Sequence, residues 1–238
     1  MRIKGIVFDK DGTLFDFQSS WGAATFDFLV SLSDGDSSTL NSLGEALEFD
    51  LQRKIFFSES IFIAGTAQET MDRLQPIIPK KTEADILTAQ QFHYSNLEQK
   101  PVKNLHKILK RLYQLGYLMS IATNDLEASA ISQLKKSGIS EFFTEIIGAD
   151  SGYGAKPEPF QLLAISEKIG LEPLEIVMVG DSTHDMIAAR RANFRACAVL
   201  TGVATELDLQ AYSDAVFDDI SYLLSWIEDQ NAISPTTK

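Results

Sequence analysis

The chain has 238 residues, of which 45% are hydrophobic and 23% charged, so it can fold as one large or two modest globular domains. Its formal net charge of −12 argues against nucleic acid and anionic membranes as partners, because both attract clustered Lys and Arg. No apolar run reaches the roughly 18–20 residues that cross a bilayer, and the start lacks the apolar segment of a signal peptide. We therefore expect a cytoplasmic protein, and the single Cys197 excludes an internal disulfide.

Short β-branched runs alternate with helical patterns over most of the chain, which predicts an α/β fold with a Rossmann-like parallel sheet. Three of the helical patterns end at a glycine, Gly116, Gly138 or Gly170, where a left-handed backbone terminates a helix. The predicted strands are 3–8, 118–122, 145–148, 175–179, 196–200 and 215–217. The predicted helices between and after them are 103–115, 126–137, 159–169, 184–192 and 220–229.

The alternation stops after the first strand, where about 80 residues show helical periodicity without a convincing strand. We expect a helical cap domain at 18–97, inserted into an α/β core made of 1–17 and 98–238. The predicted helices of the insert are 20–31, 38–56, 66–75 and 82–97. Its aromatic residues recur at helical spacing and are expected in its core: Trp21, Phe26, Phe28, Phe49, Phe56, Phe57, Phe62 and Phe92.

Polar residues follow several of the predicted strands, at the carboxyl edge of the sheet where ligands bind in parallel α/β folds. Loops that leave this edge come together in space even when they are distant in sequence. The candidate site residues at this edge are Asp9, Asp11, Thr123, Asn124, Lys156, Asp181 and Asp185.

The segment that follows the first strand contains two aspartates two residues apart. In an extended chain Asp9 and Asp11 face one side while Lys10 points elsewhere, so the two carboxylates can divide the roles of nucleophile and general acid/base. An Asp-Gly pair is also an ordinary turn signal. Similarly, Asp181 and Asp185 suit either metal ligation or a helix cap with an acidic first turn.

Because these loops are expected to meet at one edge, we favour a catalytic and metal-binding role for their aspartates over a turn or a helix cap alone. Asp9, Asp11 and Asp181 would repel one another unless a divalent cation lay among them, and oxygen ligands select Mg²⁺. Lys156 and the cation would together neutralise a phosphoryl group. The hydroxyl of Thr123 and the amides around Asn124 would bind the phosphoryl oxygens.

In this order the segments resemble the haloacid dehalogenase-like hydrolases, and within them the phosphoglycolate phosphatase-like branch with a helical cap. The resemblance covers nearly the whole chain. Its four motifs correspond to residues 8–14, 121–124, 156–157 and 179–185. It implies a phosphatase that hydrolyses a small phosphorylated metabolite. The resemblance suggests 2-phosphoglycolate as the example, and sugar phosphates and nucleotides stay open.

The resemblance also implies a role for each site residue. Asp9 would attack phosphorus to form an aspartyl phosphate, and Asp11 would protonate the leaving alcohol and then activate water. Mg²⁺ would be held by the Asp9 carboxylate, the Asp11 main-chain carbonyl and the Asp181 carboxylate, with Asp185 in support. Lys156 would bridge Asp9 and the phosphoryl group. Lys10 departs from the family, in which this position is often apolar.

Two other functions use similar loops. A sugar phosphomutase resembling β-phosphoglucomutase returns the phosphoryl group to its substrate. A signalling module resembling response-regulator receivers keeps the phosphate on its aspartate, although the insert after the first strand argues against this class. The sequence indicates neither the oligomeric state nor the cap residues that recognise substrate.

Overall fold

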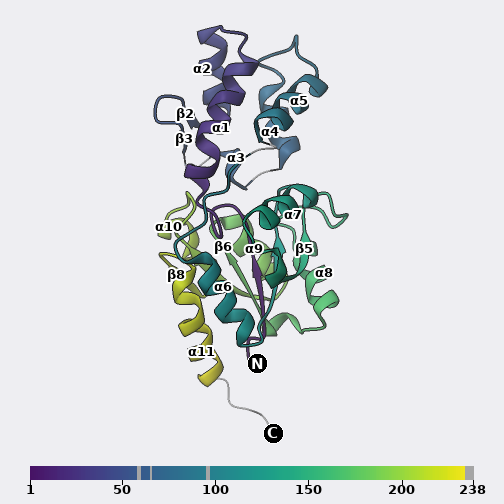
Figure 1. The fold of residues 1–238 in the computed structure, drawn as a ribbon, viewed down its shortest axis with the longest axis vertical. Coiled ribbons are helices and arrows are strands. Elements are labelled where there is room, and N and C mark those ends of the chain that lie inside the picture. The colour runs from purple at the N-terminus through teal and green to yellow at the C-terminus, as the bar shows by residue number, and fades with distance from the viewer. Residues whose placement is uncertain (58–59, 65, 95–96, 234–238) are drawn as a thin grey trace. The chain divides into compact units, whose positions relative to one another are not determined.

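A computed structural model of the chain describes residues 1–57, 60–64, 66–94 and 97–233 (Figure 1). The fold divides into two compact units, one formed by Met1–Asp16 with Pro101–Lys238 and the other by Phe17–Lys100. The second unit is inserted after the first strand of the first. Among the described residues no helix is long and apolar enough to cross a membrane.

The first unit is built on a parallel sheet with the strand order β5-β4-β1-β6-β7-β8. The central strand β1 pairs with β4 on one side and β6 on the other, so the chain changes direction across the sheet at this point. The strands are β1 (Gly5–Phe8), β4 (Leu118–Ala122), β5 (Phe143–Ile147), β6 (Ile176–Gly180), β7 (Arg195–Val199) and β8 (Ala215–Phe217).

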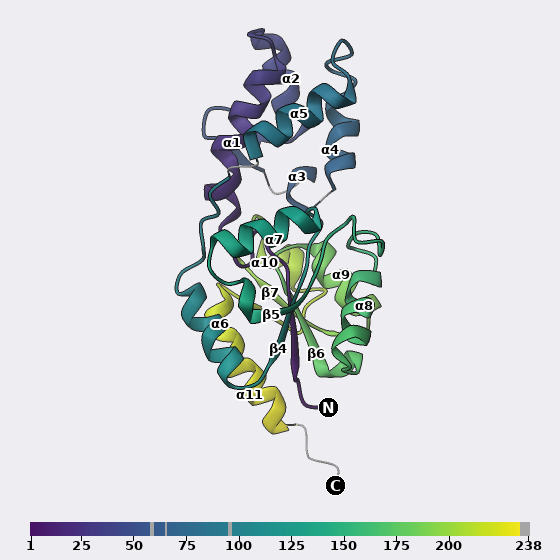
Figure 2. The ribbon, with the colours of Figure 1, turned by 45° about the vertical axis from the view of Figure 1, so that its right-hand side comes forward.

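Helices cover both faces of this sheet, which Figure 2 shows lying between α6 and α11 on one side and α8 and α9 on the other. Side chains of β1 alternate between the two cores: Ile6 and Phe8 join the first cluster and Val7 joins the second. Helices α6 (Leu105–Gln114), α7 (Glu127–Lys136) and α11 (Leu223–Ile233) pack in the first. Helices α8 (Phe160–Ile169), α9 (Thr183–Arg191) and α10 (Glu206–Leu209) pack in the second.

The predicted fold class is confirmed, and all six predicted strands form, two with the predicted ends and four with ends shifted by one or two residues. The predicted helix ends at Gly116 and Gly138 have positive φ angles of 85° and 66°, as a left-handed cap requires. The prediction missed α10 and two short 3₁₀ helices, at Ser140–Phe142 and Pro173–Glu175, which are too short to show periodicity. The predicted helix 220–229 begins as a 3₁₀ turn at Ile220–Tyr222 and continues as α11.

In the second unit the predicted helix 38–56 is wrong over its second half. Helix α2 (Ser37–Ala46) ends early, and β2 (Phe49–Asp50) and β3 (Ile55–Phe56) form a small antiparallel hairpin instead. The turn is stabilised by the Asp50 carboxylate, which accepts hydrogen bonds from the amides of Gln52 and Arg53 at 2.9 Å. The remaining helices are α1 (Phe17–Leu32), α3 (Ile61–Ala64), α4 (Ala67–Leu74) and α5 (Glu83–Tyr94).

Aromatic rings form much of the core of the second unit. Phe56 packs against Phe49 and Phe62 with ring centroids 4.8 Å apart in each pair, and Trp21 packs on Phe62 at 5.6 Å. The expectation of burial is wrong for Phe57 and Phe92, which are 48% and 76% exposed. Phe92 lies on the outer side of α5, so periodicity alone did not identify its face.

Candidate active site

The register of the sheet brings the predicted loops to one edge of the first unit. Phe8 at the end of β1 pairs with Ile121 on β4 and Val179 on β6, so the residues that follow these strands emerge side by side. The amide of Asp9 extends the pairing by donating to the carbonyl of Val179 at 2.8 Å. The edge lies where the strand order reverses, which is the position of ligand sites in open α/β sheets.

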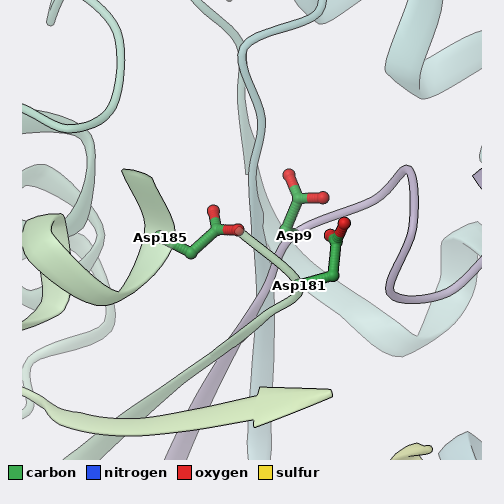
Figure 3. A group of neighbouring side chains, drawn as sticks. All are labelled: Asp9, Asp181 and Asp185. Atoms are coloured by element: carbon green, nitrogen blue, oxygen red, sulfur yellow. The ribbon is translucent and has the colours of Figure 1, made fainter. Parts of the chain in front are cut away.

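Three buried carboxylates meet at this edge (Figure 3). Asp9 follows β1, Asp181 follows β6, and Asp185 lies in the first turn of α9. Each contributes a carboxylate oxygen to a group whose atoms lie within 4.8 Å of one another. Their exposed fractions are 8%, 2% and 1%, so water screens their mutual repulsion poorly.

The ammonium group of Lys156 lies among these carboxylates. Its Nζ donates to Asp9 Oδ1 at 2.7 Å, to Asp185 Oδ1 at 2.6 Å and to the carbonyl of Ala122 at 2.8 Å. Burial lowers the pKa of Lys156, but the carboxylates of Asp185 and Asp9 raise it by more, so its pKa lies above the ordinary value. Lys156 therefore stays positively charged at neutral pH.

One ammonium does not compensate three carboxylates. Burial raises the pKa of Asp9 to about 7, Lys156 opposes this rise, and Asp185 adds to it. Burial, followed by the charges of Asp9 and Asp185, raises the pKa of Asp181 well above its usual value. The group therefore has a deficit of positive charge, which a divalent cation would correct.

Asp181 has the environment of a metal ligand. Its Oδ1 accepts a hydrogen bond from Thr13 Oγ1 at 3.1 Å, whereas its Oδ2 is buried and accepts none from the described residues. Two glycines leave room for this carboxylate, because a Cβ at Gly12 or Gly202 would lie 2.2 or 1.7 Å from Oδ2. An acceptor oxygen in such a place is costly unless a cation or donor occupies it.

Of the two roles that the sequence left open for Asp185, the structure shows the helix cap. Its Oδ2 accepts from the Ser182 amide at 3.0 Å and hydroxyl at 2.7 Å, while the Ser182 hydroxyl accepts from the Asp185 amide, so the pair forms a capping box for α9. Its Oδ1 binds Lys156. The cap thus fixes the carboxylate that orients the lysine.

Thr123 and Asn124 follow β4 at the carboxyl edge of the sheet, and Asn124 also holds the loop that contains Lys156. The carboxamide of Asn124 donates to the Lys156 carbonyl and accepts from its amide, both at 2.9 Å. The hydroxyl of Thr123 accepts from the Asp125 amide at 3.1 Å, and Thr123 is 2% exposed. The Asn124 side chain therefore holds Lys156 in place, which the sequence did not indicate.

Asp11 lies outside the group of three carboxylates, and its side chain is 12% exposed. The expectation that Lys10 points away from the aspartates is wrong for its ammonium group. Lys10 is fully buried, and its ammonium contacts the Asp11 carboxylate. The chain turns directly after β1, with Leu14 and Phe15 donating to the Lys10 carbonyl, so the alternation of an extended strand no longer holds there.

Several residues that support the site were not predicted from the sequence. Thr13 and Gly12 were visible within the first motif, but their contacts with Asp181 depend on the fold. Gly202 follows β7, and its close approach to Asp181 left no local signal. Gln161 is fully buried and its Nε2 donates to the carbonyls of Thr123 at 3.1 Å and Gly154 at 2.9 Å, joining two of the site loops.

Comparison with known proteins agrees with this arrangement. Residues 6–199 match the family described as haloacid dehalogenase-like hydrolase. The chain belongs to the haloacid dehalogenase-like hydrolases. The match includes every candidate site residue and spans the inserted unit, so this hydrolase family accounts for both parts of the fold.

Individual members of the family are similar over nearly the whole chain. A pyrophosphatase PpaX of Bacillus cereus (strain AH820) is 26% identical over 97% of this chain and 99% of that protein. A phosphoglycolate phosphatase of Psychrobacter arcticus is 24% identical over 93% of this chain and 94% of that protein. The crystal structure of a predicted phosphoglycolate phosphatase from Haemophilus somnus 129pt superposes with a TM-score of 0.74 at 23% identity, covering 95% and 98% of the two chains, and shares the fold.

Proposed function

We propose that this hydrolase is a Mg²⁺-dependent phosphatase that cleaves a small phosphomonoester through an aspartyl phosphate on Asp9. The observation that carries the proposal is the buried contact of Lys156 with Asp9, beside the unpartnered Oδ2 of Asp181. A nucleophilic carboxylate, a fixed ammonium and a cation site are the parts that phosphoryl transfer through a carboxylate requires.

In the first step a carboxylate oxygen of Asp9 forms a bond to phosphorus as the bond from phosphorus to the ester oxygen breaks. The carboxyl group of Asp11 gives its proton to the departing oxygen, which leaves as an alcohol. Lys156 donates hydrogen bonds to the phosphoryl oxygens and keeps Asp9 oriented. The hydroxyl of Thr123 and the neighbouring amides bind the other phosphoryl oxygens.

In the second step a water molecule attacks phosphorus of the aspartyl phosphate. The Asp11 carboxylate accepts the proton of this water, and the bond between phosphorus and Asp9 breaks. Inorganic phosphate leaves, and both aspartates return to their starting states. Asp11 thus acts first as an acid and then as a base.

The donor set fits magnesium, because it consists of oxygen atoms only. The carboxylates of Asp9 and Asp181 would hold the ion, together with the main-chain carbonyl of Asp11, and Asp185 would support this set. When bound, Mg²⁺ neutralises charge on the phosphoryl group. The raised pKa values of Asp9 and Asp181 support a cation here, since its charge would stabilise both ionised carboxylates.

The substrate class is supported by the relatives, which are named as phosphoglycolate phosphatase and pyrophosphatase. We assign catalysis to the unit that contains the site, and we assign the inserted unit, Phe17–Lys100, as the cap domain. A phosphoglycolate-like ester, small and anionic, is the proposed substrate.

The test is release of inorganic phosphate from a panel containing 2-phosphoglycolate, hexose 1-phosphates, nucleoside monophosphates and pyrophosphate, with Mg²⁺ or a chelator. We expect hydrolysis that needs Mg²⁺ and falls by about 10⁴-fold or more in Asp9→Asn, because that change removes the nucleophile. Activity that survives this substitution, or is indifferent to chelator, would contradict the mechanism. Isomerised hexose phosphate in place of free phosphate would indicate a mutase, and a lasting phosphate on Asp9 a receiver-like module.

A further inference from the structure

Lys10 is a buried charge that the proposed chemistry does not use. Its side chain is fully buried, and its Nζ donates to Gln133 Oε1 at 2.5 Å and lies 3.4 Å from Asp125 Oδ2. The same ammonium contacts Oδ2 of Asp11, the residue proposed as general acid and base. All four residues belong to the first unit.

Stability alone is a poor reason for a charge in this place. Removing an ammonium from water costs several kcal/mol, and its attraction to buried carboxylates often does no more than balance that cost. An apolar side chain of similar length would fill the same space without it. The contact with Asp11 therefore points to a role in placing that carboxyl group.

The ammonium is itself held by a chain of hydrogen bonds. Gln133 Nε2 donates to Ser129 Oγ at 3.2 Å, and this hydroxyl donates to Asp125 Oδ2 at 2.9 Å. The amide of Asp125 donates to Thr123 Oγ1 at 3.1 Å. Lys10 thus connects Asp11 to α7 through Gln133 and to the loop that contains Thr123 through Asp125.

We propose that Lys10 is a positioning residue that holds the Asp11 carboxyl group in place for proton transfer to and from the substrate. The inference rests on the proposed function. An anchor on Oδ2 fixes the plane of a carboxyl group and therefore the position of its second oxygen. Proton transfer requires that oxygen within hydrogen-bond distance of the leaving group, so a loosened Asp11 slows this step more than substrate binding.

The leaving group distinguishes this role from a structural one. p-Nitrophenolate departs without a proton, whereas the alkoxides of 2-phosphoglycolate and glycerol 2-phosphate need one. In Lys10→Met we expect kcat/KM for the two alkyl esters to fall by about 10- to 100-fold, with little change for p-nitrophenyl phosphate. This constant reports the first phosphoryl transfer only, so a slow second step does not obscure the comparison.

Each preparation is assayed on all three esters, so a reduced fraction of folded protein cancels in the ratio. Gln133→Leu removes the hydrogen bond between α7 and the Lys10 ammonium, and it should show the same selective loss at smaller size. If Lys10→Met does not fold, the ratio of alkyl to aryl activity in Gln133→Leu tests the role of Lys10. The matched control is Lys168→Met, which removes an exposed lysine paired with Glu145 and should leave all three constants unchanged.

An equal loss on alkyl and aryl esters, or no loss on any, would overturn the role of Lys10 while leaving the proposed function intact. A wild-type protein inactive on every ester would instead contradict the proposed function, and this inference with it. A selective loss on the alkyl esters supports both.

Discussion

Among the described residues, the two units differ in whether they bury charged side chains. In the first unit five charged side chains are buried, all of them beside the ends of β1, β4 and β6: Asp9, Lys10, Lys156, Asp181 and Asp185. In the described part of the second unit, the buried polar side chains are all neutral: Ser20, Thr25, Ser33, Ser60, Thr70 and Gln99. Around them lie the packed aromatic rings.

The buried charges of the first unit and the aromatic core of the second are expected to serve different purposes, activity and stability. Buried like charges oppose folding, and an active site retains them because they act on substrate or metal. A neutral aromatic core contributes mainly through burial of apolar area. Substitutions at the charged edge should therefore change activity and its dependence on pH and metal, whereas substitutions in the aromatic core should change stability.

After the loss of Asp9, the largest effect is expected for Lys156→Met. Phosphate release should fall by about 10³-fold, because the proposed function makes Lys156 a fixed donor to the phosphoryl group. Removing one partner of a buried ion group also costs about 3–5 kcal/mol of unfolding free energy. Urea unfolding and steady-state kinetics measure the two effects. The exposed pair of Lys168 with Glu145 is the control, and Lys168→Met should leave the unfolding free energy nearly unchanged.

A second prediction concerns the aromatic core. Phe56→Ala should lower the unfolding free energy of the second unit by about 3–5 kcal/mol, because Phe56 is 2% exposed and contacts several rings. The chain has two tryptophans, Trp21 and Trp226, one in each unit. In a Trp226→Phe background, Trp21 fluorescence follows the second unit alone. Phe92→Ala, at an exposed position, should change little; equal effects of the two would contradict the aromatic core.

A third prediction tests the space around Asp181. In Gly202→Ala the new methyl group would collide with Asp181 Oδ2, so Mg²⁺ affinity measured by calorimetry should fall about 10- to 100-fold. Gly138→Ala is the control: its φ of 66° makes alanine strained, but nothing lies within 4 Å of the new methyl. It should lower stability by about 1–2 kcal/mol and leave Mg²⁺ affinity unchanged. Unaltered affinity in Gly202→Ala would place the metal elsewhere.

A fourth prediction concerns the pH dependence of stability. Because the pKa of Asp9 is raised to about 7, the folded metal-free protein retains a proton on this carboxyl group that the unfolded chain releases near its ordinary pKa of about 3.9. The unfolding free energy should therefore fall as pH rises through this window. The proposed Mg²⁺ site needs ionised carboxylates, so added Mg²⁺ should raise Tm more at pH 8 than at pH 5.5. An increase of Tm on adding Mg²⁺ that is the same at both pH values would argue against Asp9 as a metal ligand.

Much of the first unit was predictable because its signals are local. β-branched runs identified the strands, and glycines marked helix ends at Gly116 and Gly138. The short motifs placed Asp9 and Asp181 at strand ends and Lys156 in the loop before α8. In the second unit, hydrophobic spacing at 38–56 fitted a helix, but the Asp50 turn stabilised a hairpin. The exposure of Phe92 depends on which neighbours cover α5, and no local pattern encodes that.

The amino-acid sequence by itself determined the fold class, the family and the loops that form the site, since these depend on periodicity and on short motifs. Only the tertiary structure decided the partners of each charge: Asp185 as both cap and lysine ligand, Gly202 against Asp181, and Lys10 folded back onto Asp11. The physical reason is that long side chains and buried charges select partners by distance in space. Those distances exist only once separate strands have paired and their loops meet.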